Sequence, residues 1–159
     1  MAGTEHEAET AASQAWETLQ LLWRVDHALA ILSKGMLKVL GVTGPQRMIL
    51  GIVGRRPGVT AGAISEAARI HPSTLSGILD RLERGQYLVR SKDSADGRRA
   101  CFELLPGGRT IVDARRGTVE AAVVRSLAPL SPEDRATIRR WLQAFGDELQ
   151  RERKGLDDG

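Results

Sequence analysis

The sequence predicts a mainly α-helical fold that contains one small β-hairpin. Long runs with apolar residues at helical spacing fill most of the 159 residues. Two short runs rich in β-forming residues, 87–90 and 100–105, flank a turn with the sequence DSADG. Between them and the first long run lie two short helical segments joined by a tight turn, which is the helix-turn-helix pattern. The length suits one domain with its own core.

The first predicted helix covers residues 13–40, after an acidic N-terminal arm. Trp16 and Trp23 lie on one helical face, whereas Leu21 and Val25 fall on others. A helix that is apolar on several sides must be covered on several sides, and one small domain offers little cover. We therefore expect this helix to be partly buried against a second subunit.

The next helices carry their own start signals. Thr43 and Gln46 have capping-box spacing with Pro45 in the first turn, and Pro57 ends that helix. Thr60 is the expected N-cap of a short third helix. The fourth helix follows the sequence HPS, and its apolar stripe comprises Leu75, Ile78, Leu79 and Leu82.

The C-terminal part is predicted as two long helices. Pro106, Gly107 and Gly108 are expected to break the chain after the hairpin. A long fifth helix then follows, weakened at Gly117 and stopped by Pro129. Ser131 then caps a sixth helix, with proline at its first position and acids in its first turn.

These elements predict a winged helix-turn-helix core flanked by dimerisation helices at both ends. The expected divisions are a flexible arm at 1–12, an N-terminal dimerisation helix at 13–42, a DNA-binding domain at 43–105, C-terminal dimerisation helices at 106–154 and a flexible tail at 155–159.

Charge is concentrated on this core. Residues 55–99 contain nine Lys and Arg against five Asp and Glu, a local charge of +4 in a chain whose net charge is +3. A basic patch on a helix-turn-helix is the electrostatic footprint of a protein that binds nucleic-acid phosphates.

The fourth helix supplies the first candidate DNA-binding residues. Ser73, Thr74 and Ser76 are small hydroxyl residues at its start, where they let the helix enter the major groove and bond to bases or phosphates. Arg81 and Arg84 lie further along and are expected to contact phosphates. The alternative is that the hydroxyls only cap the helix and the arginines form a solvated face.

The turn of the hairpin supplies the others. Arg98 is expected to enter the minor groove, with Asp96 orienting its guanidinium and Arg99 at a phosphate. Surface ion pairs on a solvated turn are the alternative. We expect Asp80 of the fourth helix to pair with an arginine of the hairpin.

Other classes of protein are disfavoured. A single cysteine, Cys101, excludes an internal disulfide and suits the reducing cytoplasm. The N-terminus lacks the apolar core of a secretory signal or membrane span. The three histidines are scattered, so no metal or other cofactor is expected. No arrangement of catalytic residues stands out, so we do not expect an enzyme.

Residues from roughly 43 to 108 resemble the MarR family of bacterial transcription regulators. The resemblance rests on TGPQRMIL, HPSTLSGILDRLE, YLVRSKDSADGRR and LLPGG. It implies a homodimer whose two winged helices bind double-stranded DNA at half-sites of a pseudo-palindromic operator, one helical turn (~34 Å) apart. Such proteins typically repress genes and release DNA when a small-molecule effector binds. Trp23, His27 and Arg47 are the candidates for that effector pocket, although helix packing is the alternative for His27.

Some positions depart from the family pattern. His71 stands where a capping serine is frequent, and Gly77 and Gly97 stand where arginines are frequent. The two missing arginines motivate an alternative function, a winged-helix protein-interaction module that has lost specific DNA binding. The retained Arg98 and the local positive charge favour the regulator.

Overall fold

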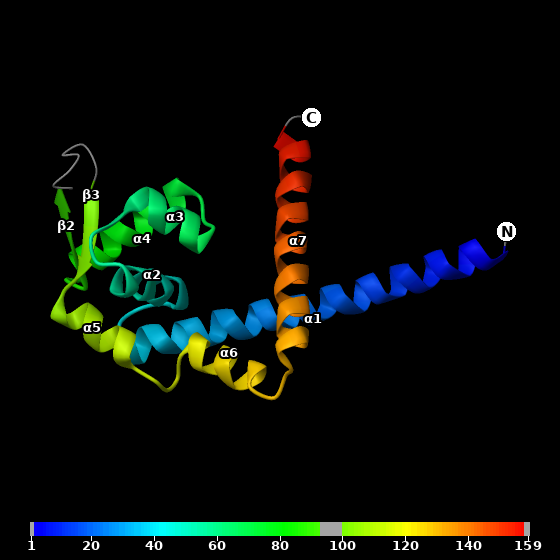
Figure 1. Cartoon of the computed structure of the whole chain (residues 1–159), viewed down its shortest axis with the longest axis horizontal. Coiled ribbons are helices and arrows are strands. Elements are labelled where there is room, and N and C mark those ends of the chain that lie inside the picture. Colours follow the sequence, from blue (N-terminus) through cyan, green and yellow to red (C-terminus); the bar gives the residue numbers. More distant parts are fainter. Residues whose placement is uncertain (1, 93–99, 158–159) are drawn as a thin grey trace. The chain divides into compact units, whose positions relative to one another are not determined.

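The computed structural model describes residues 2–92 and 100–157, with side chains for 9–92 and 100–156. Its elements are α1 (Ala2–Leu40), α2 (Gly44–Arg55), β1 (Val59–Thr60), α3 (Ala61–Ala68), α4 (Pro72–Arg84), β2 (Leu88–Lys92), β3 (Ala100–Leu104), α5 (Pro106–Asp113), α6 (Val119–Leu127) and α7 (Pro132–Asp157) (Figure 1). The predicted class, mainly helical with a small β-sheet, is confirmed. The chain forms two compact units, residues 1–119 and 120–159.

The two terminal helices are longer than predicted. α1 begins at Ala2, so the predicted arm at 1–12 is helical from its second residue onward. That segment contains alanines and glutamates, which are good helix formers, and no proline. α7 likewise continues to Asp157, into the predicted flexible tail.

The predicted helix starts are confirmed. The Thr43 hydroxyl accepts a hydrogen bond from the Gln46 N–H (3.4 Å), and the Gln46 side chain accepts one from the Thr43 N–H (2.8 Å). The hydroxyls of Thr60 and Ser131 each accept from the N–H three residues later, at 3.3 and 3.0 Å. These bonds satisfy backbone donors that the first turn of a helix otherwise leaves open.

The predicted hairpin is confirmed and belongs to a three-stranded antiparallel sheet with the order β1-β3-β2. The third strand, β1, was not predicted because it has only two residues and forms by pairing with a distant segment. In this sheet Phe102 lies opposite Val59 on one side and Arg90 on the other.

The predicted break at Pro106 and the predicted single fifth helix are both wrong. Pro106 occupies the first turn of α5, where a missing N–H costs nothing, and Gly108 is buried within that helix. The helix then ends at Asp113, and α6 starts at Val119. Gly117 between them has φ +67°, a left-handed conformation that interrupts any continuous helix.

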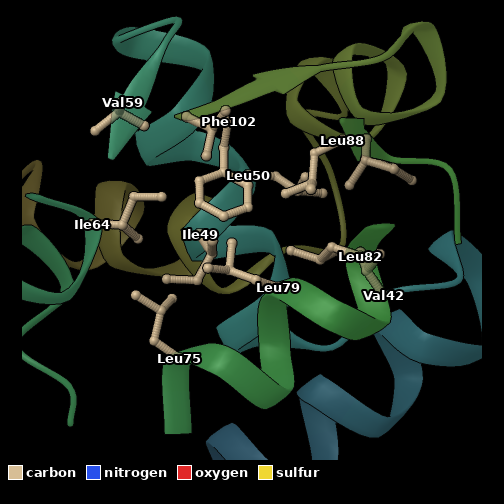
Figure 2. Packing of buried hydrophobic residues seen from close by; sticks show 12 residues of the cluster. Val42, Ile49, Leu50, Val59, Ile64, Leu75, Leu79, Leu82, Leu88 and Phe102 are labelled. Carbon is tan, nitrogen blue, oxygen red and sulfur yellow. The ribbon is translucent and has the colours of Figure 1, made fainter. Parts of the chain in front are cut away.

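One hydrophobic core joins α2, α3, α4 and the sheet. Figure 2 shows the side chains of α4 facing Phe102 of the sheet and Ile49 and Leu50 of α2. Each fully buried side chain of this size contributes about 1.5–3 kcal/mol relative to exposure. The core residues include Val42, Ile49, Leu50, Val53, Ile64, Leu75, Leu79, Leu82, Leu88 and Phe102. Burying one stripe of α4 here determines which of its faces is left for solvent.

Candidate nucleic-acid interface

The start of α4 is capped by a histidine. His71 is the N-cap residue, and its Nδ1 accepts a hydrogen bond from the Ser73 N–H (3.3 Å) and lies 2.7 Å from the Ser73 hydroxyl. Pro72 follows at the first helical position. Although a capping serine is absent, a side-chain acceptor still serves the first turn. The ring nitrogen is therefore the hydrogen-bond acceptor at the position where the resemblance implies a serine hydroxyl.

The helix has two sharply different faces. Leu75, Leu79 and Leu82 are each at most 2% exposed and point into the core. All five predicted DNA-binding residues of the helix lie on its solvent side: Ser73, Thr74, Ser76, Arg81 and Arg84. The structure thus brings hydroxyls at the helix start and guanidinium groups near its end onto one exposed surface, which we call the α4 face. Such a face offers hydrogen-bond donors and positive charge to an anionic partner.

The two arginines of the α4 face differ in their surroundings. Arg84 folds back onto its own helix, where its Nε donates to the Asp80 carbonyl (3.1 Å). Arg81 is exposed one turn earlier. Both side chains remain accessible to solvent.

The hairpin contributes a residue that sequence reasoning missed. Arg90 of β2 places its Nε 4.0 Å from the carboxylate of Glu83, and its Cζ lies 5.3 Å from the centroid of the Phe102 ring. Among the described residues, Arg90 is the hairpin arginine that pairs with an acid of α4, and that acid is Glu83. Arg98 and Arg99 lie outside the described residues, so the pairing expected for Asp80 stays a prediction. A signal was available, since Arg90 alternates with the core residue Leu88 and therefore projects from the same side of the strand.

Three predicted residues of the hairpin turn lie outside the described part of the chain. These are Asp96, Arg98 and Arg99. Their roles remain predictions from the sequence.

The residues predicted for an effector pocket occupy contrasting environments. Trp23 and His27 lie one turn apart on α1, and both are exposed in the single chain, Trp23 by 63%. Arg47 of α2 is 6% exposed, and its Nη2 donates to the carbonyls of Val112 (3.1 Å) and Ala114 (2.7 Å). Arg47 therefore ties α2 to the end of α5, where the last carbonyls of a helix need donors.

Other candidate chemistry is limited. Cys101 is buried in β3 at 7% exposure. Within residues 2–92 and 100–157, no group of three or more His, Cys, Asp or Glu side chains is placed to hold a metal ion. No helix in that same part of the chain is long and apolar enough to cross a membrane.

Comparison with known proteins agrees with this geometry. Residues 40–99, which span α2 through the hairpin turn, match the model of the MarR family. Over this stretch the chain is similar to proteins of the MarR family. This family and the relative below are transcription regulators, not enzymes.

One curated relative is the HTH-type transcriptional repressor Rv2887 of Mycobacterium tuberculosis. It is 27% identical over 128 residues, which cover 80% of this chain and 92% of the relative.

Two solved structures share the fold. The PcaV transcriptional regulator of Streptomyces coelicolor, solved with its natural ligand, is 24% identical with a TM-score of 0.66, covering 80% of this chain and 89% of PcaV. MepR of S. aureus, solved with DNA, is 23% identical with a TM-score of 0.67, covering 82% of this chain and 96% of MepR.

Proposed function

We propose that this protein is a regulator of the MarR family: a sequence-specific DNA-binding repressor that acts as a homodimer and is released by a small-molecule effector. The observation that carries the proposal is the α4 face, on which Ser73, Thr74, Ser76, Arg81 and Arg84 are exposed opposite a fully buried leucine stripe. An amphipathic helix with this division can enter the major groove without disturbing the core.

The comparisons add support at the level of the family. Rv2887 is named a repressor, MepR has been solved bound to DNA, and PcaV has been solved with its natural ligand. An effector site in this chain, with Trp23, His27 and Arg47 as candidate contacts, follows from the family resemblance. The hydrogen bonds of Arg47 to α5 favour a structural role for that residue.

A direct test is a fluorescence-anisotropy titration with the DNA upstream of the gene that encodes the protein and with a scrambled duplex. The variants are Arg81→Ala in the α4 face and Arg98→Ala in the hairpin turn. Arg139→Ala is the control, because Arg139 is an exposed arginine of α7 and its loss changes the net charge equally.

We expect tight, sequence-dependent binding by the wild type and the Arg139 variant. Arg81→Ala removes one phosphate contact, so the slope of log K against log salt should become shallower by about 0.9 per protomer. Equal, weak binding to both duplexes, together with recovery of a protein partner, would instead support the interaction-module alternative.

A further inference from the structure

Arg90 occupies an unusual position for a charged residue. It lies directly opposite Phe102 in the β2–β3 register, so both side chains project from the same side of the sheet. Its neighbours on that side, Leu88 and Phe102, are 1% and 0% exposed. The arginine thus extends the core-facing row of β2 to the point where the core ends.

The guanidinium of Arg90 sits at the junction between the hairpin and α4. It lies over the Phe102 ring at 5.3 Å, and its Nε is 4.0 Å from the Glu83 carboxylate of α4. The side chains of Arg90 and Glu83 stay 45% and 41% exposed. Solvent screens a pair this open and this long, so the pair contributes little to stability. The pair restricts the direction of the Arg90 side chain. Because the side chain is already restricted, it loses less rotamer freedom on binding a ligand than an unpaired arginine would.

The way a winged helix binds DNA predicts what the Arg90 guanidinium would meet in a complex. If α4 enters the major groove and the hairpin turn enters the adjacent minor groove, one sugar-phosphate strand separates the two elements. That strand must pass the junction at which Arg90 lies. A guanidinium has five donors in a planar fork that matches the geometry of a phosphate.

We propose that Arg90 binds the backbone phosphate that passes between α4 and the hairpin, and so sets the position of the DNA strand relative to both elements. This inference rests on the proposed DNA-binding function and assigns it a contact that the sequence did not reveal. Contacts of this kind position the duplex and carry no sequence information themselves. Glu83 orients the arginine in the free protein and, as an anion near a phosphate, opposes DNA binding.

Because Arg90 should favour DNA binding and Glu83 should oppose it, substitutions at the two residues should have opposite effects on affinity. Arg90→Ala should weaken binding about tenfold, as expected for a lost charge-assisted hydrogen bond, and by a similar factor on specific and scrambled duplexes. It should also lower the salt slope by about 0.9 per protomer. Glu83→Gln should bind at least as tightly as the wild type, since the Phe102 ring still holds the guanidinium. Arg139→Ala is the matched control and should change neither quantity.

Each outcome is decisive. Anisotropy titrations at several salt concentrations give the slopes, and circular dichroism melts confirm that each variant folds. Should Arg90→Ala fail to fold, Arg90→Lys keeps the charge and should keep the slope while losing affinity. An unchanged slope in the alanine variant, or in Arg90→Gln if alanine does not fold, would overturn this inference alone. Equal weakening by Glu83→Gln would make the pair structural and also overturn it. A wild type that binds no duplex would overturn the proposed function, and this inference with it.

Discussion

At the scale of single residues, the start of α4 depends on one ring nitrogen. His71 Nδ1 accepts from the Ser73 N–H at 3.3 Å, so the neutral imidazole with its proton on Nε2 is the form that caps the helix. The same Ser73 belongs to the α4 face. The residue that begins the helix therefore also holds a candidate DNA-binding residue in place.

Replacing His71 should measure this cap. His71→Ala removes the acceptor and should lower the free energy of unfolding by about 1 kcal/mol. His71→Ser supplies a hydroxyl acceptor at the same position and should recover most of that loss. Urea denaturation of the three proteins measures the differences. If His71→Ala proves as stable as the wild type, the histidine bond contributes nothing.

Gly108 shows a second dependence on a single residue. A Cβ added there would clash with the Tyr87 carbonyl oxygen, a backbone atom that cannot easily move aside. Gly108→Ala should therefore destabilise the protein by about 2–3 kcal/mol, within the range for overpacking.

The adjacent Gly107 provides the control for this substitution. A Cβ there would be 3.5 Å from the nearest atom, an ordinary contact. Gly107→Ala should leave stability unchanged or raise it by up to ~1 kcal/mol, because alanine favours helix. Thermal unfolding compares the two variants, and similar melting temperatures would contradict the close packing of Gly108 against Tyr87.

At the scale of elements, the sequence predicted those helices and strands whose stability depends on residues close together in the chain. The capping box at Thr43 and Gln46 and the hairpin from its β-forming runs are confirmed because their determinants lie within a few residues. β1 was missed because its pairing partner Phe102 is distant in sequence. In the candidate interface, the α4 face was predictable from helical periodicity. The side of β2 on which Arg90 lies was also predictable, from its alternation with Leu88. Its contacts with Glu83 and Phe102 were not, because they depend on how α4 and β3 pack against β2.

The break between α5 and α6 is a second feature that the apolar periodicity of the sequence did not predict. The sequence predicted one long helix weakened at Gly117, whereas the structure has two helices with Gly117 at φ +67° between them. Gly117→Ala should destabilise the protein by about 1 kcal/mol, because a Cβ disfavours left-handed backbone. Chemical denaturation followed by circular dichroism measures this change in the free energy of unfolding. A gain in both stability and helix content would mean that the helix continues through this position.

At the scale of the whole molecule, both terminal helices carry exposed apolar residues that a single chain leaves uncovered. Trp16 and Trp23 of α1 are 64% and 63% exposed, and Leu142 and Leu149 of α7 are 52% and 54% exposed. Monomeric soluble proteins rarely expose large contiguous apolar patches. We propose that a second copy of the chain buries these apolar residues in a homodimer.

Substitution within α7 tests this proposal. Leu142→Glu places a carboxylate on the apolar face and should convert a dimer to a monomer in analytical ultracentrifugation. Gln143→Glu adds the same charge one position along, away from that face, and should remain dimeric. A monomeric wild type would rule out the homodimer at the concentrations tested.

The central claim is that the α4 face reads a specific DNA sequence, and a selection of binding sites from random double-stranded DNA tests it most directly. The account predicts enrichment of one pseudo-palindrome whose half-sites are one helical turn (~34 Å) apart. It also predicts that the combined Ser73→Ala and Thr74→Ala variant enriches that sequence less. Failure to enrich any sequence, at a salt concentration where the protein is folded and dimeric, would contradict the claim.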